Sequence, residues 1–173
     1  MLLFISMEIM FFAGLISAFL VLRADGATTW PPPGQPRLPV GVTGVNTVVL
    51  LLSGVAVGRG VAALRKGGRN AQGWLVASIV LGSTFLAIQG VEWVRLVGFS
   101  LTMASSLYGA TFYVLIGAHA CHVAGGLVAL AVVFGRALRG AYTPSTNEGP
   151  RVCRMYWWFV VGIWPVLYRL MYF

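Results

Sequence analysis

Ionisable side chains are rare in this chain, and one of them lies inside an apolar run near its start. Glu8 follows the apolar residues from Met1, so a helix of about 1.5 Å rise per residue would place its carboxylate roughly 10 Å from the helix start. Such an acid usually faces a bundle interior, pairs with a donor or stays protonated on a proton pathway. Two interpretations stay open: a functional intramembrane acid, or a residue near the cytoplasmic interface that hydrogen-bonds a neighbouring helix.

Two histidines, His119 and His122, are spaced i, i+3 within another apolar segment. On a helix they would project from neighbouring positions of one face and could begin a metal site. Such a site needs further ligands, and neither another histidine nor a nearby acidic residue is available on that segment. Interhelical hydrogen bonding is therefore the favoured role, and metal binding the weaker alternative.

A further polar group lies near the end of a third apolar segment, where Gln89 and Glu92 would share a helix face. Arg95 lies three residues beyond Glu92 and is a candidate ion-pair partner. A polar patch at a helix end is usually interfacial and solvated, so solvation is the expected state. Gln89, Glu92 and Asn46 are the remaining candidates for interhelical polar contacts.

No set of residues in the chain forms a nucleophile with a base, a phosphate-binding glycine loop, or a group of haem or copper ligands. The chain alone is therefore expected to be non-catalytic and to hold no metal or cofactor. Cys121 and Cys153 lie at different expected membrane depths, so a disulfide between them is not expected.

The composition is that of a membrane protein, since 58% of the 173 residues are hydrophobic and only 9% are charged, against about 25% charged in soluble domains. The net charge of +8 does not indicate nucleic-acid binding. The basic residues lie between the apolar segments, where they act as topology signals and contact anionic lipid headgroups.

The apolar segments predict an all-α fold, a single transmembrane bundle of five helices over residues 1–173. The expected helices are residues 1–22, 46–64, 74–97, 108–138 and 155–172. The first lacks a basic leader and carries Glu8, which favours a retained helix over a signal peptide. Two stripes of small residues at four-residue spacing predict close helix packing. One consists of Gly54 and Gly58, and the other of Gly117, Cys121 and Gly125.

The loops that follow the second and fourth expected helices are richer in Lys and Arg than the other loops. The basic residues in these loops or flanking them are Arg59, Arg65, Lys66, Arg69, Arg136, Arg139, Arg151 and Arg154. The positive-inside rule therefore predicts that these loops and the N-terminus are cytoplasmic, with the C-terminus outside.

Several segments, taken in order, resemble subunit III of the haem–copper cytochrome c oxidases. They read FISMEIMFF from Phe4, WPP from Trp30, NTVVLLLSG from Asn46, LGSTFLAIQGVEW from Leu81 and YGATFYVLIGAHACHV from Tyr108. Glu8 falls on the family's buried glutamate, and His119 and His122 fall on its two histidines. The last helix departs from the family pattern, because Trp158 and Val161 replace the usual His and Asp and Pro165 follows. Any role of that His–Asp pair is expected to be absent.

The resemblance implies a multi-pass protein of a bacterial inner membrane that matches the last five helices of the seven-helix members. It implies partner subunits I and II, with haem and copper in the partner subunits and none in this chain. It also implies phospholipid binding, stabilisation of subunit I and support of proton uptake, with Glu8 near the lipid and subunit I interface. The WPP segment favours a cytochrome c oxidase over a quinol oxidase. The haem type and membership of a larger respiratory supercomplex stay open.

Two other functions are compatible with parts of the sequence. A subunit III-like accessory protein of nitric oxide reductase shares the fold and much of the motif set. A small proton-coupled transporter would also account for Glu8 and the histidines, but it would require an internal repeat and broken helices, and neither is evident.

Overall fold

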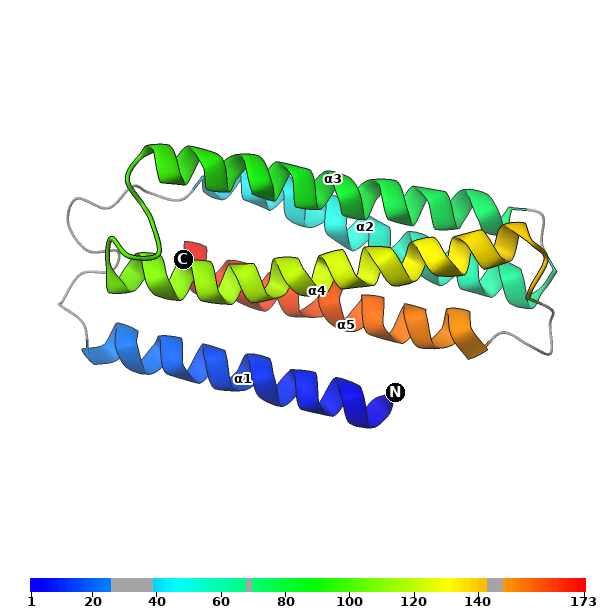
Figure 1. Ribbon diagram of the computed structural model, residues 1–173, viewed down its shortest axis with the longest axis horizontal. Helices are drawn as coiled ribbons and strands as arrows, with labels where there is room; N and C mark the ends of the chain where they lie inside the picture. The colour runs from blue at the N-terminus through cyan, green and yellow to red at the C-terminus, as the bar shows by residue number, and fades with distance from the viewer. Residues whose placement is uncertain (26–38, 68–69, 143–147) are drawn as a thin grey trace.

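The chain forms an elongated bundle of five helices that run side by side (Figure 1). The computed structural model describes residues 1–25, 39–67, 70–142 and 148–173. The helices are α1 (Leu2–Asp25), α2 (Val40–Arg65), α3 (Ala71–Gly98), α4 (Leu107–Leu138) and α5 (Glu148–Tyr172). No strand occurs within these residues, and the predicted all-α helical bundle is confirmed.

Two helices, α2 and α5, begin well before the residues at which their apolar patterns predict a start. Helix α2 begins at Val40 rather than Asn46, directly after Pro39, whose carbonyl accepts a hydrogen bond from the Thr43 amide at 3.1 Å. Helix α5 begins at Glu148 rather than Met155. An acid suits the positive end of the helix dipole, and Pro150 is tolerated in a first turn because its missing N–H would have no partner there. The WPP segment, residues 30–32, lies outside the described residues.

Four of the helices in the described part of the chain, α1 to α4, are long and apolar enough to cross a membrane. Helix α5 is less apolar because arginines and tyrosines lie along it. Its 25 residues nevertheless extend about 37 Å at 1.5 Å per residue, longer than the hydrocarbon core of about 30 Å. It runs antiparallel beside α4 through the bundle, as Figure 1 shows.

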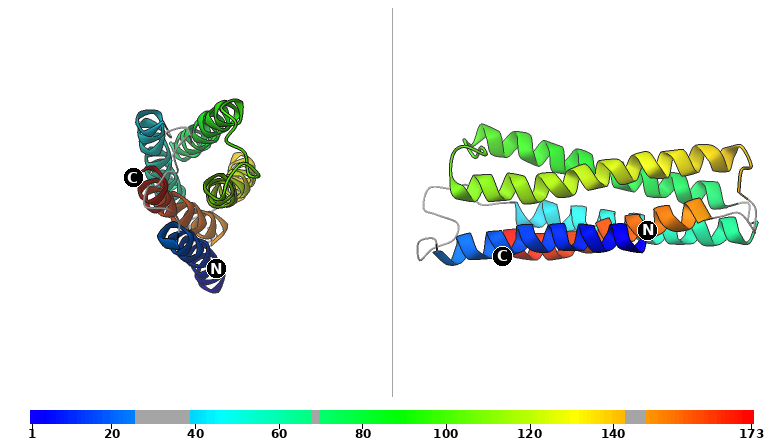
Figure 2. Two further views of the ribbon diagram at one scale, coloured as in Figure 1. Left: turned by 90° about the vertical axis from the view of Figure 1, so that its left-hand side faces the viewer. Right: turned by 60° about the horizontal axis from the view of Figure 1, so that its bottom comes forward.

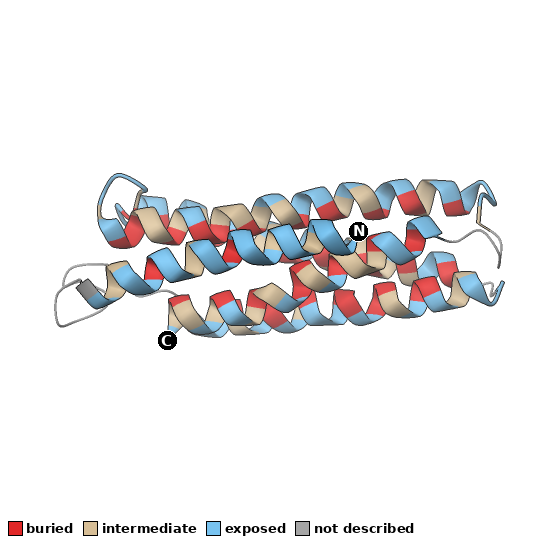
Figure 3. Ribbon diagram, turned by 90° about the horizontal axis from the view of Figure 1, so that it is seen from below, coloured by how far each residue is buried: buried red, intermediate tan, exposed pale blue. Residues whose placement is uncertain are grey.

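Helix α1 lies at the edge of the bundle, on the side away from α3 (Figure 2). Only 11% of its apolar span is buried, whereas the spans of α2 to α4 are 28–39% buried. Figure 3 shows this long exposed face. Phe12 and Phe19 are the side chains of α1 that the rest of the chain buries, and the Arg23 guanidinium donates to the Leu170 carbonyl at 3.3 Å. Helices α2 to α5 therefore form the core, to which α1 is attached by few contacts.

The indole of Trp157 lies where the four core helices meet. A Cβ atom placed on Gly82 of α3 would lie 2.8 Å from this ring, and one on Gly126 of α4 would lie 2.7 Å from it. The indole Nε1 donates to the Ser53 hydroxyl of α2 at 3.1 Å. Trp157 is fully buried, so a single side chain of α5 sets how closely the other three helices approach it.

One predicted small-residue stripe makes the expected close contact. A Cβ on Gly54 would lie 3.2 Å from Val161, and one on Gly58 would lie 3.1 Å from the Trp158 ring. The Trp158 Nε1 also donates to the Gly54 carbonyl at 2.9 Å. The two residues that depart from the resembled family pattern therefore pack together on this stripe of α2.

The other predicted stripe, Gly117, Cys121 and Gly125, is not where α4 makes its closest approach. Cys121 is exposed, and the nearest atom to a Cβ on Gly125 would be the Tyr156 hydroxyl at 3.8 Å. The tight contact is made by Gly126, the next residue of the chain. The stripe still packs in part, because a Cβ on Gly117 would lie 3.7 Å from the Trp93 ring of α3, an ordinary contact. Spacing shows which small residues share a face, but not which face makes the closest contact.

We expect Gly126→Ala to destabilise the protein and Gly135→Ala to leave its stability almost unchanged. Both glycines lie in α4, but a Cβ on Gly135 meets no atom within 4 Å. Overpacking against the Trp157 ring should cost about 1–3 kcal/mol. Thermal unfolding in mild detergent measures the difference. Equal midpoints for the two variants would contradict the packing described for Trp157.

Candidate functional site

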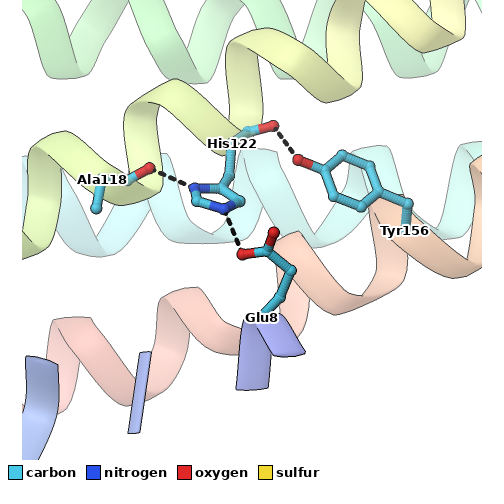
Figure 4. Close-up of polar contacts among 4 residues, drawn as sticks. All are labelled: Glu8, Ala118, His122 and Tyr156. Carbon is cyan, nitrogen blue, oxygen red and sulfur yellow. Dashed lines mark hydrogen bonds and ion pairs between the residues drawn. The ribbon is translucent and has the colours of Figure 1, made fainter. Parts of the chain in front are cut away.

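Glu8 and His122 form a polar contact between α1 and α4 (Figure 4). The His122 Nε2 atom lies 2.7 Å from the Glu8 Oε2 atom, and each side chain is 18% exposed. On the other side of the ring, His122 Nδ1 lies 2.7 Å from the Ala118 carbonyl oxygen, one turn earlier in α4. Both ring nitrogens are therefore engaged, and the ring orientation is fixed.

These contacts determine how many protons the pair holds. A carbonyl oxygen can only accept, so Nδ1 must carry a hydrogen. The short contact between Nε2 and Oε2 then requires one further proton, held either by the imidazole, giving an ion pair, or by the carboxyl, giving a neutral pair. In both cases Glu8 and His122 share a single proton along this bond. The contact with His122 thus offsets the free-energy cost of placing the Glu8 carboxylate inside the membrane.

Aromatic side chains surround the pair. The Phe12 ring meets the His122 ring edge-on at 5.0 Å, and Phe11 stacks on it at 6.0 Å. From α5, the Tyr156 hydroxyl donates to the His122 carbonyl at 3.1 Å, and its ring lies 6.0 Å from that of Phe4. The site is the place where α1, α4 and α5 meet.

His119 does not join this pair, although it lies only three residues away. It is 1% exposed, stacks on the Trp164 ring at 4.9 Å and meets Phe85 edge-on at 6.1 Å. Neither ring nitrogen has a hydrogen-bond partner among the described residues. Within the described part of the chain, no group of three or more His, Cys, Asp or Glu side chains could hold a metal ion.

The remaining candidates lie in the interior at the opposite end of the bundle from the α1 N-terminus. The Asn46 amide of α2 donates to the Phe85 carbonyl of α3 at 3.0 Å. Glu92 pairs with Arg95 at 2.9 Å, within α3. Gln89 and Glu92 are 2% and 5% exposed, so the expectation of a solvated patch was wrong. The core continues to this helix end, where Tyr172 of α5 lies beside both residues.

The sequence did not predict which side chains contact the candidate residues. Tyr156 and Ala118 fix His122, and the Trp164 Nε1 donates to the Thr47 hydroxyl at 2.8 Å. Glu8 and His122 are 114 positions apart, and no periodicity reports which distant helices are neighbours. The only local signal was that each is polar within an apolar helix.

An apolar groove of about 500 Å³ lies beside the Glu8–His122 pair, between α1, α4 and α5. Phe4 and Tyr156 line it next to the pair, and Gly125 and Val132 form part of its wall. Arg136 also lines it, near the end of α4. The groove therefore combines an apolar wall with a basic side chain close to the helix ends.

Comparison with known proteins gives consistent matches along the chain. The family model described as cytochrome c oxidase subunit III matches residues 1–173. The chain is 36% identical to a cytochrome c oxidase subunit 3 of Corynebacterium diphtheriae, covering 98% of this chain and 84% of that protein. It is 34% identical to a probable cytochrome c oxidase subunit 3 of Mycobacterium leprae, covering 98% and 83%. It is 38% identical to the cytochrome c oxidase subunit 3 of Pelomedusa subrufa, and this match covers 99% of this chain and 67% of that protein. Because the family model matches the whole chain and these relatives match nearly all of it, the chain belongs to the cytochrome c oxidase subunit III family.

Proposed function

We propose that this chain is the non-redox subunit III of a haem–copper cytochrome c oxidase in a bacterial inner membrane. Its relatives are named as subunits of that oxidase, which supports assembly with other oxidase subunits. We assign the haems and copper to partner subunits, as the resemblance to the family implies. The roles proposed here are stabilising subunit I, binding phospholipid and sustaining proton uptake.

The exposed face of α1 is the surface proposed to meet subunit I and its lipids. Its outward side chains are large and apolar, including Leu3, Met7 and Met10 at 63–77% exposure. Such a continuous apolar surface must be covered by lipid or by another protein. The Glu8–His122 pair, which attaches α1 to α4, is the observation that carries the proposal, because it fixes how that face is presented.

The groove beside this pair is the proposed phospholipid site. Its apolar wall suits an acyl chain, and its arginine, Arg136, suits an anionic headgroup. Arg136 lies in the last turn of α4, where a membrane-embedded arginine reaches the headgroup region.

Glu8 is proposed to support proton uptake by ordering this interface and not as a proton carrier. It shares one proton with His122. Glu92, which is buried near the end of α3, pairs with Arg95. Of the other glutamates in the described residues, Glu92 is engaged by Arg95 and Glu148 is exposed, so neither forms a relay with Glu8.

The proposed assembly is tested by purifying the chain through a C-terminal tag in mild detergent. We expect subunits I and II to copurify, with haem absorbance and cytochrome c-dependent oxygen consumption, whereas the separated chain should retain no haem or copper. A complex that reduces nitric oxide and not oxygen would contradict the proposal, as would stoichiometric metal in the isolated chain that a His119→Ala, His122→Ala double variant loses.

The role of Glu8 is tested by comparing Glu8→Gln with Glu8→Ala. Because Nδ1 of His122 keeps its hydrogen, a glutamine amide can donate to Nε2 and preserve the contact. Glu8→Gln should therefore leave initial turnover near wild type. Glu8→Ala leaves a cavity and an unpaired nitrogen, costing about 1–3 kcal/mol, and should loosen the subunit or shorten the active lifetime of the complex. Immediate loss of oxygen reduction in an assembled Glu8→Gln complex would show that Glu8 carries protons.

The proposed orientation places the α1 N-terminus and the α4 C-terminus in the cytoplasm, and the α3–α4 connection outside. These two ends of the bundle are separated in Figure 1. Ala141 and Ala104 are exposed at opposite ends. In a background without Cys121 and Cys153, a membrane-impermeant thiol reagent added outside should label Ala104→Cys, and Ala141→Cys should react only in inverted vesicles. Labelling of both from the same side would contradict the topology.

A further inference from the structure

Two arginines lie at the same depth along neighbouring helices. Arg59 precedes Arg65, the last residue of α2, by six positions, and Arg154 follows Glu148, the first residue of α5, by six. At about 1.5 Å per residue, each is roughly 9 Å from the end of its helix. These two helix ends lie at the same end of the bundle (Figure 1). An arginine this far inside a membrane helix extends its charge toward the headgroup region.

Each of the two arginines lies over a tryptophan ring. The Arg154 guanidinium carbon is 4.8 Å from the centre of the Trp158 ring, within α5, and that of Arg59 is 5.0 Å from the centre of the Trp74 ring of α3. A cation over the face of an indole is attracted to it and keeps its orientation. Arg59 is exposed, and Trp158 is 49% exposed. The two stacks therefore present oriented positive charge and an aromatic surface outside the bundle.

The two stacks lie on either side of α2. A Cβ on Gly58 would lie 3.1 Å from the Trp158 ring, and a Cβ on Gly60 would lie 3.3 Å from the Cβ atom of Trp74. Arg59 is the residue between these two glycines, so one tryptophan flanks it on each side. We call the four side chains that span α5, α2 and α3 in this way the arginine–tryptophan band: Arg59, Trp74, Arg154 and Trp158.

No acid in the described part of the chain pairs with the arginines of this band. The ion pairs there are Glu92 with Arg95 and Glu8 with His122. The Nε atom of Arg154 is buried and has no hydrogen-bond partner among the described residues. The band therefore carries two positive charges that no described carboxylate offsets.

A hollow of about 560 Å³ lies against the Trp74 ring, over which Arg59 is stacked. Asn70 and Gln72 also line it, and their side-chain amides can donate hydrogen bonds. Positive charge, amide donors and an indole meet here close to the membrane boundary. This combination fits a phosphate group that is attached to an apolar chain.

We propose that the arginine–tryptophan band binds an anionic phospholipid, with the phosphate at the arginines and the upper acyl chains against the indoles. Guanidinium groups bind phosphate through several N–H donors, and indoles favour the boundary between headgroups and acyl chains. None of the four side chains lines the groove beside Glu8. Trp158 replaces a histidine of the resembled family pattern, so its stack with Arg154 is not part of that pattern. The inference rests on the membrane bundle and not on the proposed oxidase function.

Titrating the delipidated, purified membrane complex with spin-labelled phosphatidylglycerol or phosphatidylcholine tests the site, because electron paramagnetic resonance measures the immobilised lipid. An Arg59→Gln, Arg154→Gln double variant should lose one high-affinity site for phosphatidylglycerol. We expect its Kd to rise about 25-fold, about fivefold for each arginine, with phosphatidylcholine binding unchanged. Arg139→Gln removes an exposed arginine at the α4 C-cap, at the same end of the bundle, and is the matched control that should change neither.

Two further arms separate a built site from general attraction to positive charge. Trp158→His leaves the formal charge at neutral pH unchanged but removes the indole under Arg154, so it should weaken phosphatidylglycerol binding severalfold. Inorganic phosphate should not displace the lipid, because it has no acyl chain to lie on the rings. Equal wild-type affinity for the two lipids, an equal loss in Arg139→Gln, no effect of Trp158→His or displacement by phosphate would each overturn the proposal. Loss of a partner subunit from the double variant, with lipid binding unchanged, would show that a protein occupies the band instead.

Discussion

A membrane interior supplies no water to hydrogen-bond polar groups and no hydrophobic force to hold helices together. The packing of Trp157 provides both a hydrogen-bond partner for a buried polar group and close contact between helices. Its ring occupies the space that Gly82 and Gly126 leave open, and its N–H reaches Ser53. Because lipid is as apolar as a leucine side chain, close contact and interhelical hydrogen bonds decide which helices associate. One fully buried indole therefore joins α5 to three other helices.

Helix α1 is attached to the bundle by contacts of a different kind. It contributes few buried side chains, so its position depends on directional contacts, chiefly the Glu8–His122 bond and the Arg23 bond to the Leu170 carbonyl. Directional bonds fix the rotation of a helix about its own axis, which apolar packing against lipid does not. A helix held in this way can present one defined apolar face to a partner while the core stays rigid.

Length and hydropathy were sufficient to predict the helices but not their first turns. The starts of α2 and α5 lie beside Pro39 and Pro150, residues that read as loop signals although proline is compatible with a first turn. The i, i+3 spacing predicted that His119 and His122 share one face of a helix, yet their rings meet different neighbours. Positions three apart still differ by about 60° around a helix of 3.6 residues per turn. At a junction of several helices, this angle directs His122 to α1 and His119 to Trp164.

Trp158 and Val161 replace the family's His and Asp, so two ionisable side chains give way to two that pack against α2. Both residues rest on the Gly54 and Gly58 stripe of α2, and the Trp158 N–H bonds to the Gly54 carbonyl. Residue 161 carries no carboxylate, and the acids that pair with a basic side chain among the described residues are the half-buried Glu8 and the buried Glu92. Each is held by a base, and a chain of carboxylates across the membrane is absent from the described residues. This is why the proposed support of proton uptake is assigned to the exposed face of α1 and not to a relay of carboxylates.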